Sequence, residues 1–469
     1  MECLIEAQTT QSVKFKEKSV VALFTRVCEW LWGYPMIIVL LGGGLFLTIR
    51  LRFIQFRIFR EMLKETIGSV FTKNKTVGQI TPFAAFSSAL GGTIGANNII
   101  GIPLAIYFGG PGVLFWMWIV ALIGMATMIT EIMLGQMYKE KNQSGEWVGG
   151  PAYYMRNGLK WKKLAFCYAL ILFLQLFVSI MVQSNAVSVS LGHSAGMPKL
   201  ITGVALMIVT ALVVFGGMKR ISRVMSVFVP LMAGLYIAAT FWVILSHTAE
   251  LRAIFKEIFV HAFTPSAALG LFPGAAIAGT LRWGLSRGLY SSEAGLGTSA
   301  IAHSATDVKK PLTQAYWGML AVIVDTLVIC TLTGLTVLCS GVWKEHSEQE
   351  VSSLVAYAFA TLIPERAAAH MLSFFLTLFV LSTIMIMIYY GEKQMEFLRP
   401  KTKMPAVRLF YLSAILAGAV CSVKLVWTLL DFFLILIVIP NILAVIKLSP
   451  AVKKALLEHS RNKSNHLNE

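Results

Sequence analysis

The chain has 469 residues, 57% of them hydrophobic and only 13% charged, and its mean hydropathy is +0.72. Apolar runs of about 20 residues recur along it, which is the length that crosses roughly 30 Å of hydrocarbon. The composition therefore excludes an ordinary soluble domain and predicts an all-α polytopic membrane protein; the net charge of +17 would suit nucleic acid, but its distribution argues against that partner.

The predicted elements begin with an amphipathic N-terminal segment over residues 1–33, whose start is too acidic and polar for a cleavable signal. A basic tail covers residues 448–469. Between them the apolar periodicity predicts about eleven transmembrane helices. We expect these spans near residues 34–52, 82–108, 113–138, 164–190, 199–217, 224–246, 268–290, 313–338, 368–391, 405–423 and 425–447.

Lys and Arg residues are divided unequally between the two sides of these spans. If the N-terminus lies outside, the connections on the cytoplasmic side and the tail from residue 447 hold 30 of the 40 Lys and Arg residues. This bias follows the positive-inside rule and puts the C-terminus in the cytoplasm. We therefore expect the basic surface to face anionic lipids, and we expect no nucleic-acid partner.

Ten of the eleven spans divide into two halves of five, 82–246 and 247–447, after an extra first helix and its basic connection at 34–81. The first span of each half contains a cluster of residues that disfavour helix. These residues are Gly91, Gly92, Gly95, Asn97, Asn98, Gly101 and Pro103 in one half and Gly270, Pro273, Gly274 and Gly279 in the other. Glycines also mark close helix packing, but two interruptions at matching positions favour two broken helices that flank a site.

A broken helix inside a membrane has a chemical use. Backbone released from helical hydrogen bonding survives in hydrocarbon only where it lines a protein cavity. There its carbonyl groups can ligate a cation, and the N–H groups at the start of the next half-helix can hold a carboxylate. Such a site suits a zwitterionic amino acid together with a small metal ion.

Several runs of the sequence resemble the alanine/glycine:cation symporter family, and the similarity spans about residues 30–450. The most specific run is RGLYSSEAGLGTSAIAHSAT at 287–306, and the others are 109–138, 149–159, 382–393 and 439–450. The resemblance implies the inverted-repeat fold of the neurotransmitter-sodium symporters behind one extra helix. It also implies import of a small neutral amino acid, with Na⁺ as the coupling ion, across a bacterial inner membrane.

The resemblance also implies a sodium site at the adjacent hydroxyls of Ser382 and Thr383. Hard cations prefer oxygen ligands, and the carbonyl groups of Gly91, Ile94 and Phe379 would complete a shell of five oxygens. The alternative is that both hydroxyls bond to carbonyl groups one turn earlier in their own helix, as Ser and Thr often do in membrane helices.

For the amino acid, the resemblance implies a pocket around the first break. Gln183 matches a family pocket glutamine, and its amide can accept from an ammonium and donate to a carboxylate; an interhelical clamp is the alternative. The sequence departs from the family at Ala96, Asn97 and Met387, where a glycine at 97 and a large aromatic residue at 387 are usual, so the preferred substrate is open. The expected substrate residues are Gly95, Ala96, Asn97, Asn98, Gln183, Phe272, Gly274 and Met387.

Three acidic residues fall inside predicted spans: Glu131, Asp325 and Asp431. Asp325 lies deepest, and could be a second cation ligand, a proton-coupling carboxyl group or a structural hydrogen-bond acceptor. Glu293 lies near Arg287, which suggests a helix cap or a gate ion pair at the cytoplasmic side.

Three other functions are weighed against sodium symport. A proton-coupled transporter of the same fold and a channel are possible on the same architecture. An intramembrane enzyme could draw on His303 and nearby Ser304, but no metal-ligand spacing, nucleophile elbow or phosphate loop accompanies them. We therefore expect no enzyme, and no feature of the sequence indicates an obligate protein partner.

Overall fold

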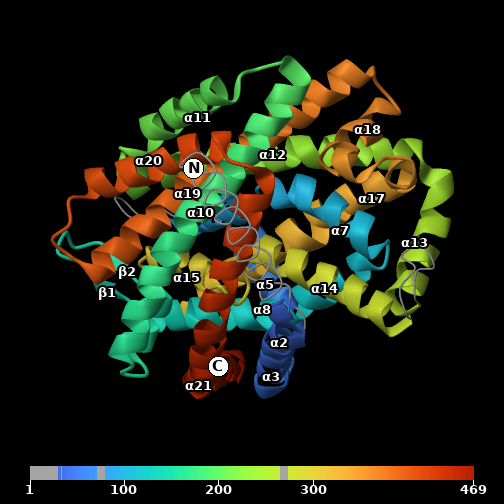
Figure 1. The fold of residues 1–469 in the computed structure, drawn as a ribbon. Helices are drawn as coiled ribbons and strands as arrows, with labels where there is room; N and C mark the ends of the chain where they lie inside the picture. The colour runs from blue at the N-terminus through green and yellow to red at the C-terminus, as the bar shows by residue number, and fades with distance from the viewer. Residues whose placement is uncertain (1–29, 33, 71–79, 265–272, 469) are drawn as a thin grey trace, which may run out of the picture.

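The computed structural model describes residues 30–32, 34–70, 80–264 and 273–468, and these residues are almost entirely helical (Figure 1). The first half contains α2 (Tyr34–Ile37), η1 (Ile38–Gly42), α3 (Gly43–Arg50), α4 (Ile54–Arg57), α5 (Phe59–Val70), α6 (Pro82–Thr93), η2 (Asn97–Gly101), α7 (Ile102–Gly109), α8 (Val113–Met137), the hairpin strands β1 (Glu140–Lys141) and β2 (Trp147–Val148), α9 (Pro151–Asn157), α10 (Lys162–Ala195), α11 (Lys199–Val214) and α12 (Gly217–Ser246). The second half contains α13 (Thr248–Phe263), α14 (Pro273–Ser292), α15 (Thr298–Ser304), α16 (Pro311–Val322), η4 (Ile323–Cys330), α17 (Thr331–Cys339), η5 (Val342–Lys344), η6 (Glu348–Ser353), α18 (Leu354–Ala360), α19 (Glu365–Leu398), α20 (Met404–Val420) and α21 (Val423–Asn468).

Each of the eleven predicted spans coincides with a helix. Within the described residues, six helices are long and apolar enough to cross a membrane, and α6 with η2 and α7 forms a seventh span that is bent by 49°. Three shorter apolar helices lie at the first, fifth and tenth predicted spans, and α14 lies at the remaining one. The polytopic, all-helical fold predicted from composition is thus confirmed, while the amphipathic segment predicted before residue 30 lies outside the described residues.

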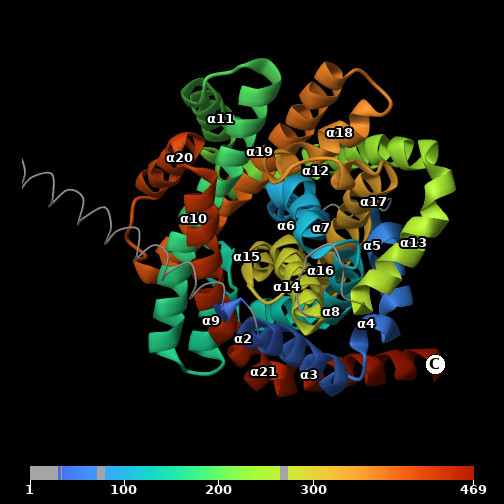
Figure 2. The same ribbon diagram turned by 45° about the vertical axis from the view of Figure 1, so that its right-hand side comes forward.

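The long helices enclose the broken one. α10 packs along α19, α20 and α21, and α8 packs against α14 and α16. α6 lies between α12 and α19, near the middle of the molecule (Figure 2). Apolar side chains of the outer helices α11 and α12 are exposed, for example Leu212 at 62% and Val227 at 69%, as expected for surfaces that contact lipid rather than water.

The second glycine cluster is only partly placed. Residues 265–272, which include Gly270 and Phe272, lie outside the described residues. α14 then begins at Pro273 and continues without interruption through Gly274 and Gly279 to Ser292, so these two glycines do not break the helix. Helical geometry ends instead after Ser292, where Gly295 and Gly297 have φ of 103° and 78°. From sequence alone, glycines in a predicted membrane helix can indicate either a break or close packing against a neighbouring helix. At Gly274 and Gly279 the helix continues, as close packing allows.

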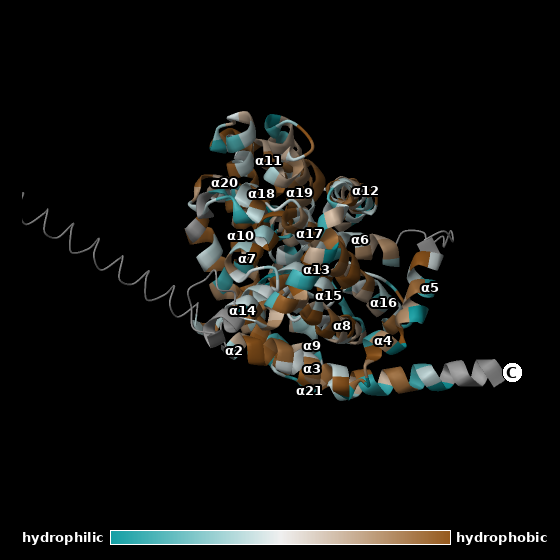
Figure 3. Cartoon of the chain, turned by 90° about the vertical axis from the view of Figure 1, so that its right-hand side faces the viewer, coloured by the Kyte–Doolittle hydropathy of each residue, from teal (hydrophilic) through white to brown (hydrophobic). Residues whose placement is uncertain are grey.

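The last helix is longer than the span predicted at 425–447. α21 is continuous across the predicted start of the tail at residue 448 and reaches Asn468. Its C-terminal half passes α3 and α4 at the edge of the molecule (Figure 3). We call the side of the molecule that carries the ends of α8 and α19 and the start of α10 the basic side. The connection between α8 and α10 and the one between α19 and α20 lie there, around one cavity.

Candidate functional site at the broken helix

The first break forms where α6 ends. Thr93 is the last residue of α6, and Ile94 adopts an extended conformation with φ −76° and ψ 95°. The chain resumes as the wide helical turn η2 at Asn97 before α7 begins. The break therefore lies at Ile94–Ala96, within the glycine-rich stretch that predicted it, and it frees backbone groups inside a fully buried region.

The carbonyl groups freed at this break meet α19. The hydroxyl oxygen of Thr383 lies 3.1 Å from the carbonyl oxygen of Gly91 and 2.9 Å from that of Ile94, and it is 3.0 Å from the carbonyl oxygen of Phe379 in its own helix. Ser382 donates to the same Phe379 carbonyl at 2.7 Å. All five predicted sodium ligands thus lie together and buried.

This cluster has fewer hydroxyl hydrogens than oxygen–oxygen contacts. The Thr383 hydroxyl has one hydrogen and faces three carbonyl oxygens, so at least two of these contacts have no hydrogen between their oxygens. Back-bonding within α19, the alternative weighed above, accounts for the Phe379 contact but not for those to Gly91 and Ile94. A buried group of oxygen atoms with too few hydrogens is what a hard cation requires.

Gln183, which is predicted to line the amino-acid pocket, lies beside this cluster. Gln183 on α10 accepts a hydrogen bond from the N–H of Ala96 at 2.9 Å. A Cβ atom at Gly95 would lie 2.9 Å from the amide atoms of Gln183 and from the hydroxyl oxygen of Thr383. Gly95 is therefore the point at which the break, the pocket glutamine and the hydroxyl cluster come closest, and no larger residue fits there without displacing one of them.

Asn98 links the break to Asp325. Its side-chain oxygen accepts from the N–H of Gly95 at 2.9 Å, and its amide nitrogen donates to Asp325 at 2.7 Å. Ser291 and Thr326 also donate to Asp325, which is completely buried in the wide turn η4 and forms no ion pair within the described residues. The sequence identified Asp325 and Asn98 separately, and Ser291 and Thr326 gave no signal of their own.

Asn97, the departure from the family pattern, points elsewhere. Its amide nitrogen donates to the backbone carbonyl of Arg287 on α14 at 3.2 Å, and its side-chain oxygen is buried without a hydrogen-bond partner. That oxygen would lie 2.1 Å from a Cβ atom at Gly101, so Asn97 covers the start of α7. A buried unpaired acceptor is costly unless something binds it.

Other predicted residues are placed without a direct contact to the break. Met387 is buried one turn beyond Thr383 on α19. Glu293 accepts from Thr298 at 2.5 Å rather than pairing with Arg287. The guanidinium of Arg287 lies over the rings of Trp283 and Trp427, at 5.2 and 4.8 Å from their centres. The predicted ion pair between Glu293 and Arg287 is therefore not formed within the described residues.

The remaining acidic residue with a defined contact has a structural role. Glu131 on α8 accepts from the side-chain amide of Asn441 at 2.5 Å, and Asn441 also donates to the backbone carbonyl of Gly295. Tyr154 donates to the side-chain oxygen of Asn441. These contacts join α8, α9 and α21 to the loop after α14.

His303, the part proposed for an enzyme, is buried in α15, where burial lowers its pKa to about 3. It therefore stays neutral at physiological pH, and its Nδ1 lies 2.5 Å from the amide nitrogen of Gln314.

A cavity of about 420 Å³ lies between α7, α10, α18 and α19 on the side opposite the basic side. It extends to Asn185 and Ala186, within three residues of Gln183 on α10, and to Ile100 on η2. Its wall also includes Trp427 of α21, the residue that stacks on Arg287. The cavity thus approaches the break from one side only.

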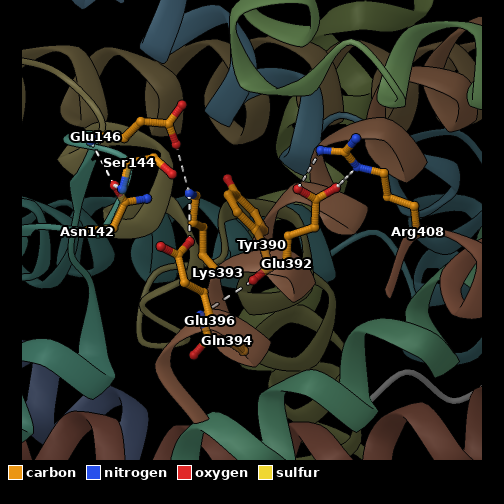
Figure 4. Close-up of polar contacts among 9 residues, drawn as sticks. All are labelled: Asn142, Ser144, Glu146, Tyr390, Glu392, Lys393, Gln394, Glu396 and Arg408. Carbon is orange, nitrogen blue, oxygen red and sulfur yellow. Dashed lines mark hydrogen bonds and ion pairs between the residues drawn. The ribbon is translucent and has the colours of Figure 1, made fainter. Parts of the chain in front are cut away.

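On the basic side, charged side chains link α19 to α20 and to the β1–β2 hairpin (Figure 4). Lys393 donates to Glu396 at 2.9 Å and to Glu146 in the β1–β2 hairpin at 3.2 Å. Arg408 of α20 holds Glu392 with two contacts, of 2.6 and 3.1 Å. A cavity of about 380 Å³ lies among these groups on the basic side. Sequence reasoning missed this network because its members come from two helices, α19 and α20, and from the β1–β2 hairpin, which is far from them in the sequence.

The Arg408–Glu392 pair gives a prediction on stability. Both side chains are largely buried, at 14% and 8% exposure, so Arg408→Gln leaves a carboxylate without its cation. We expect the free energy of unfolding to fall by about 2–4 kcal/mol, measured as reduced thermal stability of the purified protein. Arg399→Gln removes an exposed Arg that directly follows α19, the helix of Glu392, and is the control. Equal losses of thermal stability in the two variants would show that the Arg408–Glu392 ion pair does not stabilise the fold.

Asn97 gives a prediction on selectivity. Asn97→Gly removes the bond to Arg287 and the unpaired oxygen, and it opens space against Gly101. If that oxygen faces the substrate, the ranking of glycine, alanine, serine and larger amino acids as competitors of uptake should change. An unchanged ranking in a well-expressed variant would show that Asn97 acts only on the packing of α7 and α14.

The fold and the site define a class of protein: a multi-span integral membrane transporter built around a broken central helix. The chain belongs to the sodium:alanine symporter family, whose sequence profile matches residues 17–469. It is 45% identical over 433 residues to the uncharacterized transporter YflA of Bacillus subtilis, with 92% of each chain covered. It is 35% identical over 457 residues to the sodium/alanine symporter AgcS of Methanococcus maripaludis, covering 95% of this chain and 99% of that one.

The fold is also similar to a solved structure. The crystal structure of MhsT in complex with L-phenylalanine superposes with a TM-score of 0.59 at 14% identity, covering 79% of this chain and 89% of MhsT. At that identity the likeness concerns the fold alone. Together with the helical architecture it confirms the predicted class, an extra helix followed by an inverted-repeat core.

Proposed function

We propose that the protein is a sodium-coupled symporter that imports a small neutral amino acid by alternating access. The observation that carries this proposal is the group of five oxygens at Gly91, Ile94, Phe379, Ser382 and Thr383, with too few hydrogens to satisfy them. Family membership supports an amino acid as the substrate. Na⁺ at this group would hold α6 against α19 and fix the shape of the break.

The amino acid would bind at the N–H groups beyond the break. In the structure the N–H of Ala96 and that of Gly95 are held by the side-chain oxygens of Gln183 and Asn98. A substrate carboxylate can replace either acceptor, and Gln183, once released, can accept from the ammonium. The narrow space at Gly95 supports a substrate with a small side chain, and so does the relative AgcS, a sodium/alanine symporter.

Alternating access would proceed between the two cavities. We assign the 420 Å³ cavity to the external side and the charged network on the basic side to the cytoplasm of a bacterial cell, with the N-terminus outside. The positive-inside bias of the connections supports this orientation. Opening toward the cytoplasm would require Glu146 and Arg408 to release α19.

Proton coupling is a second candidate, and Asp325 favours it. This carboxyl group is completely buried, has three hydrogen-bond donors and no basic partner among the described residues, and reaches Gly95 through Asn98. A proton taken up there would weaken the Asn98 contact and so alter the break. On this account the hydroxyl group of Thr383 would be structural.

Uptake into proteoliposomes separates the two candidates. Purified protein is reconstituted, and labelled alanine uptake is measured with an inward Na⁺ gradient, with choline in place of Na⁺, and with a proton gradient in choline. We expect concentrative uptake only with the Na⁺ gradient, and competition by other small neutral amino acids. Uptake that follows the proton gradient and is lost in Asp325→Asn would contradict sodium coupling, and uptake that neither gradient concentrates would contradict symport.

A further inference from the structure

A second, smaller pocket lies far from the break, on the basic side of the molecule. It has a volume of about 190 Å³ and lies where the corner between α3 and α4 meets the C-terminal half of α21. In Figures 2 and 3 these helices lie beside one another at the edge of the molecule. Its basic residues are Arg50, Arg52, Arg57, Lys453 and His459.

The charge of this pocket is not neutralised by the protein. Within the described part of the chain, none of the three arginines nor Lys453 forms an ion pair with a carboxylate. The one acidic residue of the wall, Glu61, contacts His459 at 3.0 Å. Four cations thus line a small volume, and Glu61 is the one carboxylate among the described residues of its wall, so the wall has an excess of positive charge that attracts an anion.

The backbone at the corner is strained in a way that gathers these cations. Arg52 and Phe53 have φ of 58° and 54°, the left-handed region that residues other than glycine rarely adopt. Two such residues in succession reverse the chain between α3 and α4, so that Arg50, Arg52 and Arg57 line one pocket. Strain of this kind persists only where the surroundings hold it.

Apolar side chains beside the pocket are exposed. Phe53, Phe56 and Phe59 are 51%, 59% and 45% exposed, and Leu457 of α21 is 48% exposed. The pocket floor contains Leu51, Ile54, Ile58 and Leu456. A cluster of cations next to exposed aromatic residues matches a phospholipid, whose charged headgroup and acyl chains lie side by side at a membrane surface.

We propose that this pocket binds the phosphate headgroup of an anionic phospholipid whose acyl chains lie along Phe53, Phe56 and Phe59. The basic connections between the spans predict only a general attraction of the protein surface to anionic lipids. The pocket, in contrast, is a specific binding site for one lipid molecule. The bound lipid would link α3 and α4 to α21. Among the described residues, no ion pair of Arg50, Arg52, Arg57 or Lys453 makes this link. This proposal does not depend on the transported substrate.

The test counts bound lipid by native mass spectrometry of the detergent-purified full-length protein titrated with dioleoyl phosphatidylglycerol. Dioleoyl phosphatidylcholine is the neutral reference. The variant Arg57→Gln/Lys453→Gln removes two pocket cations, and Arg60→Gln/Lys454→Gln removes two exposed cations from the same helical region outside the pocket. Removal of each pocket cation should weaken phosphatidylglycerol binding about fivefold, or about 25-fold for both, with the control variant close to wild type.

Three outcomes would overturn the proposal. They are equal losses in the two double variants, equal binding of phosphatidylcholine and phosphatidylglycerol, and displacement of the bound lipid by millimolar inorganic phosphate, which would indicate a site for a free anion. The charge-conserving variant Arg57→Lys/Lys453→Arg distinguishes lost charge from lost folding. It should retain binding to within a few-fold, and its failure to do so would also contradict the proposal.

Discussion

In the double variant Ser382→Ala/Thr383→Val, the Na⁺ concentration needed for uptake should rise by at least about 100-fold. Each hydroxyl is a ligand to a charged ion, and a hydrogen bond or similar contact to a charged group is worth about 1.5–3 kcal/mol, or roughly 10- to 100-fold in affinity. The substitutions nearly preserve volume and leave the carbonyl groups of Gly91, Ile94 and Phe379 in place. Three backbone oxygens are too few to hold a hard cation well. The measurement is the Na⁺ concentration that gives half-maximal uptake in proteoliposomes.

Thr377→Val is the matched control on the same helix. Its hydroxyl donates only to the carbonyl of Ser373, one turn earlier, so its loss should leave the Na⁺ requirement unchanged. Maximal amino-acid binding at saturating Na⁺ should change less in the double variant than the Na⁺ requirement does. A double variant with the wild-type Na⁺ requirement would place the ion elsewhere, and Asp325 is the next candidate.

Gln183→Ala should lower the apparent affinity for the amino acid about 10- to 100-fold. The substitution removes the group that we assign to both ends of the zwitterion, and it leaves the N–H of Ala96 without its acceptor. The loss should appear in the substrate concentration for half-maximal uptake and in equilibrium binding of the labelled amino acid.

Gln175→Ala provides the comparison for Gln183, since both residues are buried on α10. The amide of Gln175 donates to Ser179 on the same helix and has no described contact with the break. Its loss should affect folding or expression as much as the loss of Gln183 does, but not affinity. If Gln183→Ala transports with wild-type affinity, Gln183 is an interhelical clamp, the alternative that its sequence context allowed.

The sequence predicted the helices and the first break well, for a physical reason. Hydrophobic length follows directly from the thickness of the hydrocarbon, so each span could be counted. The stretch Gly91–Pro103 is rich in glycine, asparagine and proline, which have low helix propensity, and α6 does end there. Local patterns could not predict the contacts of Thr383 with Gly91 and Ile94, because 292 and 289 residues, respectively, separate these partners. Only the family resemblance brought them together.

Other features could not be obtained from the sequence. Gly274 and Gly279 look like the glycines of a break, yet they continue α14, because a glycine inside a membrane helix can equally serve close packing. Gly284 illustrates this, since a Cβ atom there would lie 2.7 Å from the side chain of Trp116. The contacts of Lys393 and Arg408 on the basic side depend on how α19, α20 and the β1–β2 hairpin meet, and no local sequence pattern predicts that.

We propose above all that Na⁺ and the amino acid bind around the same break and stabilise each other. Equilibrium linkage measures this directly: the affinity for labelled alanine is determined with and without Na⁺, and the affinity for Na⁺ with and without alanine. The two ratios must be equal for any coupled pair, so we expect each ligand to raise the affinity of the other by the same large factor. That factor should fall close to one in Ser382→Ala/Thr383→Val. Alanine binding to the wild-type protein that is indifferent to Na⁺ would contradict the account.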